Sequence, residues 1–208
     1  WSSDVCSSDL GVLWLPLVTI VALSFNSRSS ISWPPRDPTL KWWRGIVHVS
    51  AARDALLTSA KLALLAVLIA VVLGSLLAFA MAGRDFFGKR TVNFLVVLPI
   101  ALPGIVTGVA MRNAFLRLGV DLGLASVVAG HATFCIVIAY NNVVARLRRM
   151  APNVREASAD LGASSFQTFR HVTWPLVRGS VVAGAILAFA LSFDEIVVTT
   201  FTAGAGVE

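Results

Sequence analysis

The chain has 208 residues, of which 57% are hydrophobic and only 13% are charged, and its mean hydropathy is +0.80. This composition excludes an ordinary soluble domain, because long apolar runs between short polar stretches are typical of chains that fold in lipid. The net charge of +6 is spread over the junctions between the apolar runs, so we attribute it to anionic headgroups and expect no nucleic-acid partner.

About five apolar runs approach the length of roughly 20 residues that a helix needs to cross the hydrocarbon core. They cover residues 10–25, 55–82, 92–111, 123–145 and 179–201. None shows the alternation of a barrel strand. The sequence therefore predicts an all-α, polytopic membrane helix bundle embedded in the lipid bilayer.

The N-terminal quarter divides into two parts. Residues 1–10 are rich in Ser and Asp directly against an apolar run, and we interpret them as a non-native remnant. Residues 11–54 are expected to form the first transmembrane helix and an extracytoplasmic loop, whose prolines exclude one continuous helix and whose tryptophans suit interfacial anchors: Trp33, Trp42 and Trp43. Dense basic clusters place the loops 83–91 and 146–178 in the cytoplasm.

The third run contains Pro99, Pro103, Gly104 and Gly108. Its backbone is expected to break or bend and then to approach a neighbouring helix closely through small residues. Two interpretations stay open, an ordinary kink and a bend that lines a pathway, since freed backbone groups at membrane depth need protein or water to receive them.

No catalytic, metal or cofactor site is predicted, so the chain is not expected to be an enzyme. The three histidines lie in three different segments: His48, His131 and His171. Gly83, Gly88 and Lys89 have the spacing of a phosphate-binding loop, but Arg90 stands where that motif needs Ser or Thr.

The loop 146–178 has a helical pattern of its own. Pro152 and Asn153 are suitable starting residues, and Val154, Ala157 and Leu161 recur at i, i+3 and i+7. Gly162 can take the left-handed conformation that ends a helix.

A second short helix is expected after this turn, capped by Ser164 or Ser165, with Phe166 and Phe169 on one face. Pro175 is expected to prevent its continuation into the next span without a break. The resulting helix-turn-helix unit lies outside the bilayer, either as an amphipathic hairpin on the headgroups or as a plug for a cytosolic partner.

The motif Glu156-Ala157-Ser158, with Gly162 and Val172-Thr173-Trp174-Pro175, resembles the EAA loop of ABC-importer permeases. That pattern is E-A-A-x-x-x-G, nine residues, I-x-L-P, and here Ser158, Val172 and Trp174 replace Ala, Ile and Leu. The resemblance covers residues 40–207, and residues 190–201 are similar to the fifth-helix signature of spermidine/putrescine permeases. Permeases for phosphonate, opine or ferric iron share parts of that signature and remain alternatives.

The resemblance implies a type I importer permease fold, which has six spans. Residues 55–208 would then form its permease domain, truncated at the C-terminus. It implies a multi-pass location in the bacterial inner membrane, with cytosolic ATPase subunits, a second permease subunit and an extracytoplasmic substrate-binding protein as partners. ATP would be hydrolysed by a partner. The residues expected to couple the chain to that ATPase are Glu156, Ala157, Ser158, Asp160, Leu161, Gly162 and Pro175.

Asp194 and Glu195 lie within the fifth run. An ionised carboxylate at the centre of a spanning helix costs roughly 2.5 to 3.5 kcal/mol, so something must offset it. One interpretation is snorkelling to the headgroups; the other is contact with the ammonium groups of a polycationic substrate. Ser192 and Pro103 complete the hypothetical substrate pathway.

Two other classes of membrane protein are alternatives to an importer permease. An ion-driven secondary transporter would need more spans or internal repeats with intramembrane ionisable residues, and spans two to four show almost none apart from His131. A membrane scaffold without transport activity would not require the EAA spacing.

Overall fold

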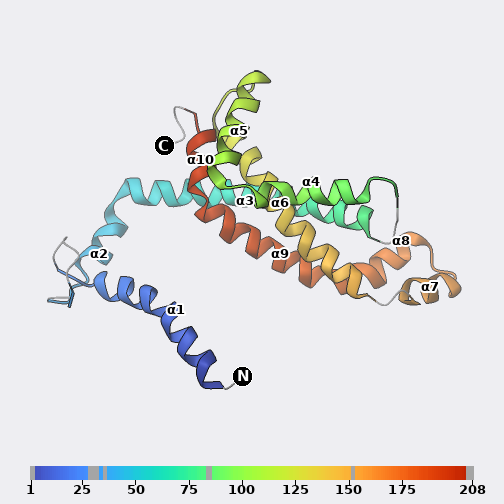
Figure 1. Cartoon of the computed structure of the whole chain (residues 1–208), viewed down its shortest axis with the longest axis horizontal. Coiled ribbons are helices and arrows are strands. Elements are labelled where there is room, and N and C mark those ends of the chain that lie inside the picture. The colour runs from blue at the N-terminus through green and yellow to red at the C-terminus, as the bar shows by residue number, and fades with distance from the viewer. Residues whose placement is uncertain (1–2, 28–32, 35–36, 83–85, 151–152, 205–208) are drawn as a thin grey trace. The chain divides into compact units, whose positions relative to one another are not determined.

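The computed structural model describes residues 3–27, 33–34, 37–82, 86–150 and 153–204, and every regular element among them is a helix (Figure 1). The all-α prediction is therefore confirmed. The chain divides into two units, Trp1–Leu56 and Leu57–Glu208, which are described separately. The elements are α1 (Ser3–Leu23), α2 (Lys41–His48), α3 (Ser50–Met81), α4 (Lys89–Ala101), α5 (Gly104–Arg117), α6 (Leu124–Arg149), α7 (Asn153–Asp160), α8 (Ser165–Thr168), the π-helix η1 (Phe169–Thr173), α9 (Trp174–Asp194) and α10 (Ile196–Thr202).

In the first unit, the tryptophans of the polar loop bind back to the end of α1. The indole of Trp42 donates to the carbonyl of Asn26 at 2.9 Å, and that of Trp43 donates to Ser24 Oγ at 3.3 Å. Trp43 also stacks on Phe25 with ring centroids 6.1 Å apart. These contacts link the start of α2 to the end of α1. Residues 3–10 form the beginning of α1, and their non-native origin stays a prediction.

Three described helices are long and apolar enough to cross a membrane: Ser50–Met81, Leu124–Arg149 and Ser165–Asp194. The pair α4 and α5 would make a fourth span if it is counted as one bent element. The apolar part of α1, Trp14–Leu23, is shorter. The predicted number of about five spans is thus approximate.

A stripe of small residues on α3 allows α6 to approach it closely. Ala66, Ala70, Gly74 and Ala78 recur every four residues, and all are buried. A Cβ added to Gly74 would lie 2.8 Å from the carbonyl oxygen of Ile136, so the two backbones are in direct contact there. This is the way membrane helices associate when hydrophobic burial cannot drive them together.

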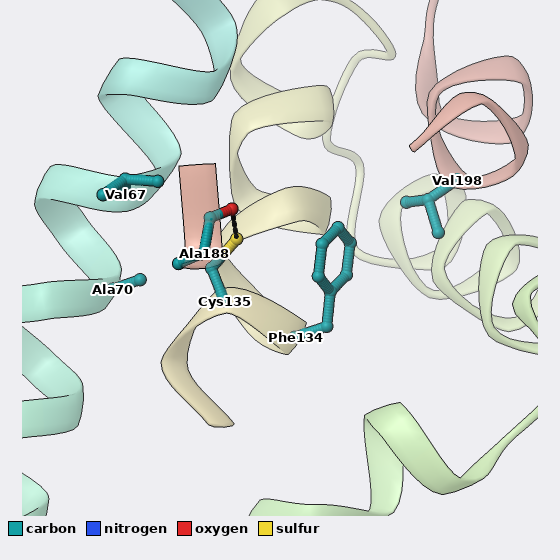
Figure 2. Packing of buried hydrophobic residues seen from close by; sticks show 6 residues of the cluster. All are labelled: Val67, Ala70, Phe134, Cys135, Ala188 and Val198. Atoms are coloured by element: carbon teal, nitrogen blue, oxygen red, sulfur yellow. Dashed lines mark hydrogen bonds between the residues drawn. The ribbon is translucent and has the colours of Figure 1, made fainter. Parts of the chain in front are cut away.

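α6 lies at the centre of the second unit and packs against α3 and α9. Figure 2 shows one core cluster, in which α3 supplies Val67 and Ala70, α6 supplies Phe134 and Cys135, and α9 supplies Ala188. The Cys135 thiol donates to the Ala188 carbonyl at 3.5 Å. A second cluster continues along the helices, with Ala78, Met81, Tyr140, Val143, Val144 and Val177 buried.

The third apolar run is not one kinked span. α4 and α5 meet at an angle of 109°, with the break at Leu102 and Pro103. Leu102 is extended (φ −87°, ψ 145°), as expected for a residue before proline, and Pro103 then starts α5 as its N-cap. The predicted break is confirmed, but it is sharper than a kink.

The fifth apolar run also differs from the prediction. We expected one helix over residues 179–201, whereas α9 ends at Asp194, Glu195 is extended (φ −81°, ψ 94°), and α10 starts at Ile196. The Glu195 side chain accepts a hydrogen bond from the Val198 N–H at 3.0 Å and so caps α10. A capping carboxylate explains why a new helix begins inside an apolar run. Figure 1 shows α10 and α5 at one end of the α6–α9 pair, and α7 and α8 at the other.

Candidate functional site

The hairpin of α7 and α8 is closed by a well-defined turn. Gly162 has φ +77°, and its N–H donates to Ala159 O at 2.9 Å, while the Ala163 N–H donates to Ser158 O at 3.0 Å. This pair of bonds is a Schellman motif, which satisfies the last carbonyls of α7. The predicted left-handed role of Gly162 is confirmed. α7 begins at Asn153; Pro152 lies outside the described residues.

The second helix of the hairpin starts with a capping box. Ser164 Oγ accepts from the Gln167 N–H at 3.3 Å, and the Gln167 side chain accepts from the Ser164 N–H at 2.7 Å. Ser164, rather than Ser165, is therefore the cap. Turn and cap together fix the path of the chain from residue 161 to residue 168.

The expectation that Pro175 separates the hairpin from the fifth span is wrong. α8, η1 and α9 run without interruption over Ser165–Asp194. A π-turn lies directly before the proline, with the Trp174 N–H bonded to Phe169 O five residues back, and this wider turn accommodates the Pro175 ring and its missing N–H inside a continuous helix.

The base of the hairpin is packed on the spanning helices. The ring of Phe169 meets Phe79 of α3 edge to face, with centroids 5.4 Å apart, and Thr173 is buried. Arg146, near the end of α6, donates from Nε to the Leu176 carbonyl at 3.0 Å. A cavity of about 260 Å³ lies between the hairpin and its base, lined by Ala159, Ala163, Ser165, Thr168, Phe169 and Thr173.

The tip of the hairpin is apolar and open to its surroundings. Leu161 is 88% exposed and Phe166 is 68% exposed. The acidic residues Glu156 and Asp160 beside them are exposed as well. The tip thus combines large apolar side chains with carboxylates, a composition suited to a protein partner.

The predicted coupling residues occupy different parts of this hairpin. Glu156, Ala157, Asp160, Leu161 and Gly162 lie together on α7 and its turn, and are exposed. Ser158 is half-buried, with its hydroxyl donating to Val154 O at 3.0 Å, which is a structural role. Pro175 lies at the base, in the first turn of α9.

At the opposite end of α9, the four predicted pathway residues lie at the two helix breaks. Asp194 is exposed and Glu195 is half-buried at the α9–α10 break, while Ser192 is buried just before it. Pro103 lies at the break before α5. The two breaks are neighbours, because a Cβ on Gly104 would lie 3.7 Å from Val197 and one on Gly108 would lie 2.7 Å from the Phe201 ring. The predicted close approach at Gly104 and Gly108 is confirmed.

Sequence reasoning missed the part that His131 plays at this break. His131 is only 3% exposed, and its ring lies within 2.8 Å of Ser192 Oγ through Nδ1 and within 2.8 Å of Thr199 Oγ1 through Nε2. The scatter of the three histidines along the chain does not by itself predict a shared site. The available signal was an ionisable residue in the middle of an apolar run.

Comparison with known proteins places most of the chain in one family. The family model for the binding-protein-dependent transport system inner membrane component matches residues 70–207. The spermidine/putrescine transport system permease protein PotC of Escherichia coli (strain K12) is 33% identical over 197 residues, 94% of this chain and 74% of that protein. The PotC protein of Haemophilus influenzae is 30% identical over 94% of this chain and 76% of its own length.

Two further matches are more distant. The putrescine transport system permease protein PotI of Escherichia coli (strain K12) is 29% identical over 206 residues, 93% of this chain and 71% of that protein. Among solved structures, a bacterial ABC transporter involved in the import of the acidic polysaccharide alginate matches with a TM-score of 0.55 and 18% identity, over 92% of this chain and 72% of that one. This likeness concerns the fold alone. The chain belongs to the family of binding-protein-dependent transport system inner membrane components.

Proposed function

We propose that the chain is a multi-pass permease subunit in the bacterial inner membrane, that it forms part of the translocation pathway of an ABC importer, and that its cargo is a polyamine such as spermidine or putrescine. Its hairpin of α7 and α8 docks on a cytosolic ATPase subunit that hydrolyses ATP. A second permease subunit and an extracytoplasmic substrate-binding protein complete the importer. The names of the PotC and PotI relatives support this cargo.

The observation that carries the coupling role is the unbroken helix that joins the hairpin to the spanning region. The exposed pair Leu161 and Phe166 offers an apolar grip, and α8 continues through η1 into α9. When a closing ATPase displaces the hairpin, α9 therefore moves with it, because α8, η1 and α9 form one helix. Two-state motion of packed helices of this kind is a common route to switching.

The carboxylates at the α9–α10 break support a cationic cargo. Asp194 is exposed and Glu195 is half-buried. Two acidic side chains at this place attract the ammonium groups of a polyamine and repel an anionic cargo such as a phosphonate. Opines and ferric iron remain the alternative cargoes, and an ion-driven secondary transporter is the alternative class.

Transport by the reassembled importer tests the proposal. The chain is reconstituted in proteoliposomes with its second permease and ATPase subunits, and uptake of labelled spermidine and putrescine is measured in the presence of the binding protein. Uptake should require ATP and should disappear when the ATPase is omitted. Uptake that persists without the ATPase and follows an ion gradient would establish a secondary transporter.

The role of the carboxylates is tested separately. The double variant Asp194→Asn, Glu195→Gln removes both charges, while the new Gln side chain can still accept the Val198 hydrogen bond. Polyamine uptake should fall, with the larger effect on KM. Asp121→Asn, which removes an exposed carboxylate between α5 and α6, is the matched control and should have little effect. Equal uptake in the double variant and the control would remove the carboxylates from the pathway.

A further inference from the structure

His131 connects the two helices that meet at the α9–α10 break. Its ring lies on α6 and is sealed from the surroundings at 3% exposure. Nδ1 is 2.8 Å from Ser192, in the last turn of α9, and Nε2 is 2.8 Å from Thr199, in the first turn of α10. One side chain therefore holds both sides of the break.

The hydrogen-bond network determines which nitrogen carries the proton. The Thr199 hydroxyl donates its only hydrogen to the Glu195 carbonyl at 2.7 Å, so toward His131 it can only accept. On this basis we assign the proton to Nε2, so that Nδ1 of the neutral ring accepts from the Ser192 hydroxyl. The chain of bonds runs from Ser192 through His131 and Thr199 to the backbone of Glu195.

The two acidic residues lie between the two ends of this chain of bonds, Ser192 and Thr199. Asp194 is the last residue of α9, Glu195 is the one residue between α9 and α10, and neither side chain contacts the His131 ring through a hydrogen bond in the described part of the chain. The Glu195 carboxylate is held by the Val198 N–H, and its carbonyl by Thr199. The direction of the Glu195 carboxylate thus follows from how α10 is set against α9, and the angle between the two helices determines where Asp194, at the end of α9, lies relative to it.

We propose that His131 is a positioning residue, which fixes the angle at the α9–α10 break and thereby aims Asp194 and Glu195 at a cationic cargo that His131 itself never touches. The inference rests on the proposed role of these carboxylates in transport. The buried His131 ring bonds to one residue of α9 and one of α10. Loss of either bond leaves a buried polar group unsatisfied and allows α10 to rotate relative to α9.

Three substitutions separate the two bonds. His131→Gln places an amide N–H near the position of Nε2 and can keep the bond to Thr199, whereas His131→Asn places an acceptor near Nδ1 and can keep the bond to Ser192. His131→Leu keeps apolar volume and loses both. The control is Ser126→Ala, which removes another buried α6–α10 bond, from Ser126 Oγ to Thr202 O at 2.8 Å, away from the carboxylates.

Uptake kinetics in the reconstituted importer provide the first measurement. We expect the KM for spermidine to rise roughly tenfold in His131→Leu and about threefold in the Gln and Asn variants, with the maximal rate changed less than about twofold. Ser126→Ala should leave KM unchanged. A KM in His131→Leu equal to that of the parent, or an equal rise in Ser126→Ala, would overturn the inference, since the effect would then be absent or would reflect general packing.

A second measurement does not depend on transport. Asp194→Cys is labelled with a membrane-impermeant thiol reagent, with and without His131→Leu, in a background in which Cys6 is serine and the buried Cys135 is retained. A changed labelling rate is expected, and an unchanged rate contradicts a positioning role even if KM rises. If labelling changes while the Asp194→Asn, Glu195→Gln variant transports normally, the positioning holds and the proposed role of the carboxylates fails.

Discussion

Gly162 is the position at which the proposed coupling can be tested by backbone strain alone. Its φ of +77° belongs to the left-handed region, and nothing lies within 4 Å of an added Cβ, so a substitution there makes no steric clash with neighbours. That conformation costs an L-residue about 1 to 2 kcal/mol, which lowers the ratio of molecules with the Schellman turn formed to those with it lost by roughly 5- to 30-fold. A β-branched side chain adds to this strain.

Gly162→Ala and Gly162→Val should therefore weaken the Schellman turn and reduce ATP-driven uptake, with Val the more severe. Gly162→Asn should retain more activity, because Asn tolerates the left-handed region. The assay measures uptake and ATP hydrolysis together in proteoliposomes, so that the cargo transported per ATP is obtained. Membrane insertion should be unchanged in all three variants, since the turn lies outside the spanning helices.

Two glycines provide matched controls. Gly119 has φ +68° and equally free surroundings, so Gly119→Ala carries similar strain in a different turn. Gly179→Ala adds a Cβ in open space without positive φ. Both should leave the ratio of uptake to hydrolysis unaffected. Normal uptake in Gly162→Val, or the same loss in Gly119→Ala, would refute the reasoning.

Three further predictions follow from the packing. Gly74→Leu should prevent stable insertion or assembly, measured as the yield of folded protein in detergent, because its Cβ alone would come within 3.0 Å of α6 backbone atoms; a normal yield would contradict the close contact. Gly108→Leu should displace the Phe201 ring, only 2.7 Å from an added Cβ, and lower uptake more than folded yield; equal losses in both would show that the site is structural. Leu161→Ser with Phe166→Ser should weaken copurification of the ATPase without affecting insertion, and retained ATPase binding would place the docking surface elsewhere.

The α7–α8 hairpin could be predicted from the sequence because its determinants are local. Gly162 and Ser164 act within one turn of the backbone, through left-handed geometry and a side-chain cap, and both were recognisable from residue type and spacing. The continuation of the helix through Pro175 was not predictable, because it involves a π-turn whose first residue, Phe169, packs against Phe79, 90 positions earlier. No local rule contains that information.

The region around Asp194 and Glu195 could be predicted only in part. Two carboxylates in an apolar run indicated either an interfacial or a functional position, but hydropathy does not distinguish a helix that carries charges from one that ends at them. The break depends on Glu195 capping α10 and on His131 reaching Thr199, which is 68 positions away. The stripe of small residues around Gly74 could not be predicted either, since alanines are common throughout apolar spans and only the packing of a second helix shows which of them lie in a contact.

The continuity of α8, η1 and α9 has a geometric consequence for the importer. The 30 residues of Ser165–Asp194 form a rod of about 45 Å at about 1.5 Å per residue. If this rod pivots near its hairpin end, a tilt of about 5° sweeps its far tip through about 4 Å, comparable to the width of an alkyl chain. In the importer that we propose, an angular change too small to disturb the packing at the pivot would thus be magnified at Asp194 into a displacement large enough to open or close a passage for a slender cation.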